Sequence, residues 1–81
     1  MNVRVLFFGP LVDVTGSSTL ELALPGASTV QTLLEELFQR WPALRDWEPN
    51  LLVAVNLAYA RREDSIPPGS EIAIMPPVQG G

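Results

Sequence analysis

The spacing of apolar residues along this chain changes near residue 28, and this change limits the folds that the chain can adopt. Before it, Leu20, Leu22 and Leu24 alternate with polar or small residues, the two-residue period of a strand with one buried face. After it, apolar residues recur at intervals of three and four, as on one face of a helix: Val30, Leu33, Leu34, Leu37, Phe38 and Trp41. Strand and helix patterns therefore coexist in one short chain.

The apolar stripe predicts a helix over about residues 29–41. Ser28 and Gln31 have the spacing of a capping box, in which side chains bond the first free N–H groups of a helix. Pro42 follows the stripe, and a proline ring clashes with a continuing helix. We expect this helix to be long enough to cover one face of a small sheet.

Strand-like runs lie on both sides of the predicted helix. They cover residues 3–8, 18–24, 51–56, 58–60 and 71–75. Several of them stop at glycine and proline pairs, which rarely continue a strand. The first two runs are expected to pair as a hairpin. Asp13 and Thr15 are assigned to a turn, and residues 43–50 to a loop with Trp47 tucked beneath it.

A chain of 81 residues has room for one modest core. Two layers, one helix across one sheet, bury every apolar stripe in this order of elements. We predict an α+β protein of β-grasp, or ubiquitin-like, architecture, with one helix packed on a mixed sheet of four to five strands. Residues 1–76 form the β-grasp domain in this prediction, and residues 77–81 form a flexible, extended C-terminal Gly-Gly tail.

The composition excludes several chemistries. Because the chain contains no cysteine or histidine, it cannot build a zinc finger, a disulfide scaffold or a Ser–His–Asp triad, and we expect no metal site. Five arginines stand against nine acidic residues, so we expect no nucleic-acid partner. The first apolar run is too short for a signal sequence or a membrane span, and we expect a cytoplasmic protein without a membrane partner.

The alternation of side chains along a strand predicts which of them point away from the core. Arg4 marks the solvent face of the first strand, which places Leu6 and Phe8 on the same face. Glu71 does the same for the last strand and places Met75 outside. We expect both strands to be edge strands and these apolar residues, with Tyr59 as a fourth member, to form a docking patch for a partner. Alternatively, they are isolated exposed side chains without a role.

The C-terminal residues form a tail that another protein could reach. Pro76 and Pro77 stop the last strand and favour an extended path through Val78 and Gln79. Gly80 and Gly81 lack side chains, so the terminal carboxylate can thread a narrow channel. A carboxylate becomes an acyl donor once a partner enzyme adenylates it. Gly-Gly by itself is equally compatible with an inert tail.

Three segments of the chain match the pattern of one known family. They are the opening segment Val5-Leu6-Phe7-Phe8-Gly9, continuing to Thr15-Gly16, and the run from Leu51 to Asn56 with its Val-Asn ending. The third and most specific is the closing block from Gly69 to Gly81, which ends in Pro-Pro-Val-x-Gly-Gly. In these segments the chain resembles the first strand and loop, the central strand and the closing block of the molybdopterin synthase small subunit family, the MoaD-like sulfur carriers.

The resemblance implies a β-grasp fold and a role as the sulfur carrier of molybdenum cofactor biosynthesis. A ubiquitin-activating-like (MoeB-like) enzyme would use ATP to adenylate Gly81, and a persulfide sulfur donor would convert it to a thiocarboxylate. The tail, from Pro76 to Gly80, would thread into the large (MoaE-like) subunit, and Phe8, Leu6, Tyr59 and Met75 would dock there. Sulfur would pass to cyclic pyranopterin monophosphate, and the chain itself would bind no cofactor.

Two other functions stay open at this point. One is a carrier of the same fold that serves thiazole synthesis or tRNA thiolation, or a ubiquitin-like modifier joined to lysines of other proteins. The other is a plain binding module with an inert tail. The patterns that distinguish them lie in the tail and in the apolar patch.

Overall fold

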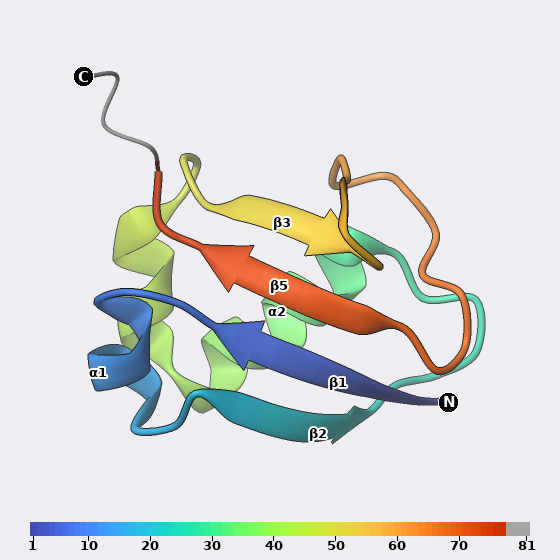
Figure 1. The fold of residues 1–81 in the computed structure, drawn as a ribbon, viewed down its shortest axis with the longest axis horizontal. Coiled ribbons are helices and arrows are strands. Elements are labelled where there is room, and N and C mark those ends of the chain that lie inside the picture. The colour runs from blue at the N-terminus through green and yellow to red at the C-terminus, as the bar shows by residue number, and fades with distance from the viewer. Residues whose placement is uncertain (78–81) are drawn as a thin grey trace.

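Five strands form one mixed sheet in the order β2-β1-β5-β3-β4 (Figure 1). The computed structural model describes residues 1–77. The strands are β1 (Asn2–Phe7), β2 (Thr19–Ala23), β3 (Leu52–Val55), β4 (Ala58–Tyr59) and β5 (Glu71–Met75). The pair β1–β5 is parallel, whereas β1–β2, β3–β5 and β3–β4 are antiparallel. This sheet confirms the predicted order of strands and the hairpin pairing of the first two.

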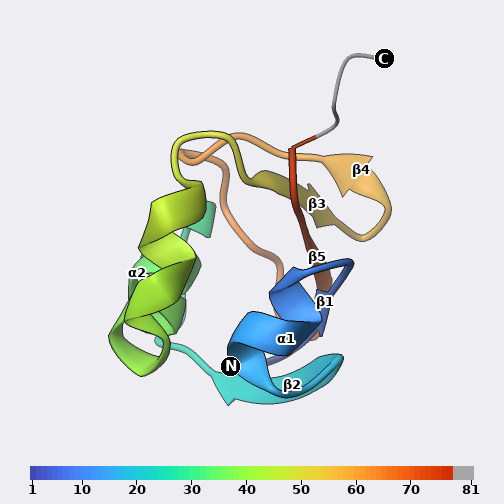
Figure 2. The same ribbon diagram turned by 90° about the vertical axis from the view of Figure 1, so that its left-hand side faces the viewer.

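Helix α2 (Val30–Arg40) packs on one face of the sheet, as the side view in Figure 2 shows. The residues of the predicted apolar stripe that fall within it are buried: Val30, Leu33, Leu34, Leu37 and Phe38. The predicted cap is wrong by one residue, because Thr29 Oγ1 accepts from the N–H of Thr32 at 3.3 Å. Ser28 Oγ instead donates to the carbonyl oxygen of Pro25 at 2.6 Å.

Two short helices replace segments that were expected to be a turn and a loop. α1 (Leu11–Thr15) follows β1 and ends at Gly16, which adopts φ 74° and donates its backbone N–H to the carbonyl oxygen of Val12. η1 (Pro42–Trp47) is a 3-10 helix whose Leu44 is fully buried. Trp47 packs partly buried against the core, as expected. Both helices are too short to show a recognisable hydrophobic periodicity in the sequence.

The core lies between α2 and the inner face of the sheet. Val3, Val5 and Phe7 from β1 and Ile72 and Ile74 from β5 are buried, which confirms the predicted parity. The prediction of edge strands is wrong, because parallel pairing places β1 and β5 in the middle of the sheet. The edges are β2 and the two-residue β4.

The last described residues lead away from the end of β5. Pro76 lies beside Gly9, since a Cβ on Gly9 would stand 3.4 Å from Pro76 Cγ. The predicted tail residues Val78, Gln79, Gly80 and Gly81 lie outside the described residues. Within residues 1–77, no helix has the length and apolar character needed to cross a membrane.

Candidate functional site

Of the described elements, no helix covers the face of the sheet opposite α2 (Figure 2). This outer face is charged where β1 and β5 begin. There, Arg4 Nε lies 3.3 Å from Glu21 Oε1, and Glu71 is the register partner of Arg4 on β5. Because β1 and β5 are parallel, both strands also finish at the same end of the sheet, and the residues there are apolar. The outer face is therefore divided between a charged and an apolar region.

A shallow recess of about 310 Å³ occupies the apolar region. It is lined by Phe8, Ala54, Leu57, Tyr59, Ala73 and Met75. Ala54 is the register partner of both Ala73 on β5 and Tyr59 on β4. Two small side chains facing each other across neighbouring strands leave the hollow, and larger apolar side chains surround it. Such a surface on a small protein is typical of a partner site.

The structure brings together three of the four residues predicted to dock a partner. Phe8, Tyr59 and Met75 line the recess, and Phe8 and Tyr59 are 45% and 74% exposed. Leu6 lies on the same outer face, half-buried and in register with Ala73, but does not line the recess. The tail residues Pro76 and Pro77 follow directly after Met75, so the chain leaves the sheet beside this recess.

Leu57 is the main residue that the sequence analysis missed. Its side chain is 95% exposed, and it occupies the turn between β3 and β4. A signal was available: only two residues, Asn56 and Leu57, separate two apolar runs, as in a tight hairpin. Ala54 and Ala73 were also missed, because small residues carry no hydrophobic pattern of their own.

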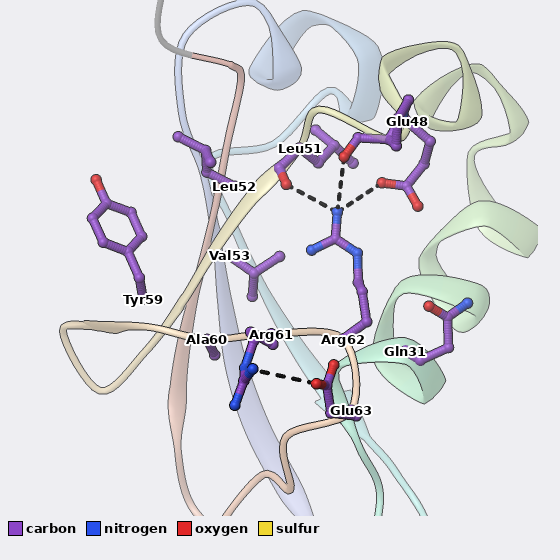
Figure 3. A pocket seen from close by; sticks show the side chains of 11 residues that line it. Gln31, Glu48, Leu51, Leu52, Val53, Tyr59, Ala60, Arg61, Arg62 and Glu63 are labelled. Atoms are coloured by element: carbon purple, nitrogen blue, oxygen red, sulfur yellow. Dashed lines mark hydrogen bonds and ion pairs between the residues drawn. The ribbon is translucent and has the colours of Figure 1, made fainter.

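A second hollow, of about 530 Å³, lies beside β3 and holds charged side chains (Figure 3). Arg62 Nη2 lies 2.9 Å from Glu48 Oε1 and donates to the carbonyl oxygen of Leu51 at 2.9 Å. Arg61 pairs with Glu63 at the rim, 3.7 Å apart. The charged side chains of this hollow pair with one another, which favours a structural role for them in joining two loops. Among the described residues, no three His, Cys, Asp or Glu side chains form a group that could hold a metal ion.

Comparison with known proteins relates this geometry to one family. The chain matches the ThiS family over residues 5–81. It is 32% identical to the molybdopterin synthase sulfur carrier subunit of Arabidopsis thaliana, over all of this chain and 84% of the relative. It is also 32% identical to the human protein of that name, over 99% of this chain and 94% of the relative.

Two solved structures share the fold over the full length of both chains. SAMP1 from Haloferax volcanii is 30% identical, with a TM-score of 0.85. The other, at 26% identity and a TM-score of 0.68, comes from the complex of subunits 1 and 2 of the molybdopterin-converting factor of Helicobacter pylori. These likenesses confirm the predicted β-grasp fold. The chain therefore belongs to the ThiS family and, within it, is a full-length relative of molybdopterin synthase sulfur carrier subunits.

Proposed function

We propose that this chain is a sulfur carrier protein, the small subunit of a molybdopterin synthase, acting in the cytoplasm. The observation that carries the proposal is its full-length relationship to proteins of that name. The structure supports it, because the strand that leads into the tail ends beside an exposed apolar recess. A carrier needs both features: a reachable end and a surface by which its partners hold the body.

The chemistry proceeds at the carboxylate of Gly81. Its oxygen attacks the α-phosphate of ATP on an adenylating enzyme (MoeB-like), and pyrophosphate leaves. The terminal sulfur of a persulfide then attacks the acyl carbon and AMP leaves. A thiol reduces the resulting S–S bond, becomes oxidised to a disulfide itself, and releases the thiocarboxylate. In this proposal ATP is bound by the activating enzyme, and the chain holds no cofactor.

The thiocarboxylate would then enter the large subunit (MoaE-like) and give its sulfur to cyclic pyranopterin monophosphate, toward the dithiolene of molybdopterin. Gly80 serves as a spacer without a side chain, and Pro76 to Gln79 thread the channel. The catalytic side chains belong to the large subunit. Phe8, Tyr59 and Met75, with Leu6 beside them, would contact that subunit. The Helicobacter pylori complex of two subunits supports a partner of this kind.

Intact-mass measurement of the protein purified from its source tests the proposal. We expect a fraction whose mass corresponds to sulfur in place of one oxygen, and fragmentation should place the change on Gly81. A variant lacking Gly80 and Gly81 should still bind the large subunit but form no molybdopterin. Molybdopterin formation by this truncated variant would contradict the proposal.

A protein modifier is the second candidate, favoured by the likeness to SAMP1, a small archaeal modifier protein. One sequence feature limits what such a modifier could build. The 81 residues contain no lysine, so no side-chain amine is available to accept a second copy. A modifier would therefore build no chains through its own side chains. Immunoblots of the source organism distinguish the candidates, because a modifier gives many covalent adducts and a carrier gives none.

A further inference from the structure

We propose that Leu57 is a docking contact whose side chain enters an apolar pocket of the protein that receives the tail. This inference rests on the proposed function, since it assigns a residue to the interface with the large subunit. Four observations carry it: the backbone of the turn, the exposure of the side chain, the bonds that hold the turn and its position beside the recess.

The backbone at Leu57 adopts a conformation that disfavours leucine. Asn56 and Leu57 have φ values of 50° and 73°, and they form the two-residue connection between β3 and β4. A hairpin with positive φ at both central positions favours asparagine followed by glycine. Asn56 fits this rule, whereas a leucine Cβ in the left-handed region crowds the backbone. Glycine at position 57 would therefore suit the turn better than leucine does.

Packing of the Leu57 side chain in the core does not compensate for this strain. The Leu57 side chain is 95% exposed, the highest value among the exposed large apolar residues, and does not belong to the core cluster. Strained residues that persist without an internal benefit are characteristic of functional sites. The compensating contact is therefore expected outside the chain.

The turn that carries Leu57 is held firmly against β5. Asn56 donates its backbone N–H to the carbonyl oxygen of Glu71 at 2.8 Å, and Asn56 Oδ1 accepts from the N–H of Glu71 at 3.0 Å. Asn56 Nδ2 also lies 3.2 Å from Ser70 Oγ. These bonds fix the hairpin to the strand that continues into the tail. A preordered side chain loses less conformational entropy when it binds.

The position of Leu57 favours the tail-receiving protein as its occupant. In Figure 2 the β3–β4 hairpin stands out from the face of the sheet that α2 leaves uncovered. Leu57 borders the same recess as Phe8 and Met75, and the chain leaves the sheet immediately after Met75. A protein that takes up the tail must approach this face. A second copy is a poorer occupant, because it would cover the root of the tail and bring together two chains of net charge −4.

Replacement of Leu57 by glycine separates a contact role from a structural one. Leu57→Gly removes the side chain and relieves the turn, so we expect the midpoint of thermal unfolding to stay the same or rise. Affinity for the purified large subunit, measured by calorimetry, should fall by about tenfold or more, the effect of a contact hot spot. Leu57→Met, which keeps an apolar side chain of similar reach, should retain most of the affinity.

Each other result has a definite meaning. Equal affinity of wild type and Leu57→Gly overturns the inference while leaving the proposed function intact. A lower unfolding midpoint for Leu57→Gly shows a structural role and also overturns it. Failure of the wild-type chain to bind the large subunit overturns the proposed function together with the inference. A wild-type dimer in sedimentation that dissociates in Leu57→Gly would assign Leu57 to self-association and overturn the choice of partner.

Discussion

Arg62 and Glu48 form a half-buried salt bridge, with Nη2 and Oε1 2.9 Å apart, between the loop before β3 and the segment after β4 (Figure 3). The same Nη2 donates to the carbonyl oxygen of Leu51. One guanidinium therefore ties together two segments that are separate in the sequence, beside the strand pair that carries the recess.

Arg62→Ala should lower the free energy of unfolding by about 3 kcal/mol, because it removes two hydrogen bonds of a charged group, to Glu48 and to the carbonyl oxygen of Leu51, which contribute about 1.5 kcal/mol each. The removal also leaves Glu48 without this ion-pair partner. Chemical denaturation measures this change. Arg61→Ala is the matched control, since its pair with Glu63 is well exposed and should contribute at most about 1 kcal/mol. Equal losses for the two arginines would contradict this account of the site.

Thr29→Ala should destabilise the protein by about 1 kcal/mol, the usual effect of losing an N-cap side chain. The physical reason is that the N–H of Thr32, which now donates to Thr29 Oγ1, would lose its partner at the start of α2. Thr29→Ser keeps the hydroxyl and should lose much less. Thermal unfolding of the three proteins measures the order, and identical midpoints would refute the assignment of the cap.

Gly9→Ala should cost about 1–2 kcal/mol, because Gly9 has φ 58° and a β-carbon is crowded in the left-handed region. The new methyl group would also stand 3.4 Å from Pro76 Cγ, at the start of the tail. Gly26→Ala provides the control, as nothing lies within 4 Å of its would-be β-carbon. We expect Gly26→Ala to change the free energy of unfolding by less than about 0.5 kcal/mol. A comparable loss at both positions would disprove the argument.

Met75→Glu should weaken binding of the large subunit by about tenfold or more, because an unpaired carboxylate would be buried in an apolar interface. Its fold should persist, since Met75 is only partly buried on the outer face. Gln39→Glu places the same charge on the exposed side of α2, which packs on the opposite face of the sheet, and should leave binding unchanged. Calorimetric titration of both variants provides the comparison. Unchanged affinity of Met75→Glu would remove the recess from the docking surface.

Much of the fold could be predicted, because the signals involved are local. The period of the stripe from Val30 to Phe38 follows from helix geometry, and the burial of Val3, Val5 and Phe7 follows from the alternation of side chains along a strand. The cap was misplaced because Ser28 and Thr29 carry the same hydroxyl function, and only the three-dimensional path shows which one faces the helix end. α1 and η1 were missed because neither is long enough to show a period.

The candidate site was predictable in part. Parity alone placed Phe8 and Met75 on the outer face, and the tail motif was visible in the last residues. The recess itself was not predictable, since Ala54 and Ala73 become neighbours only through the register of β3 and β5. Leu57 was overlooked because a single apolar residue in a turn has no pattern, and its meaning comes from its backbone angle and exposure.

By itself, the sequence determined the helix, the strands and the inward or outward direction of each strand residue, because these depend on covalent geometry and on neighbours within a few positions. It also determined the chemistry left to the chain, since cysteine, histidine and lysine are absent. Only the tertiary structure decided that β1 and β5 lie in the middle of the sheet, that Arg62 reaches Glu48, and that Leu57 borders a recess beside the end of β5. Those relationships join residues far apart in the chain, and they arise from strand pairing and packing of the whole domain.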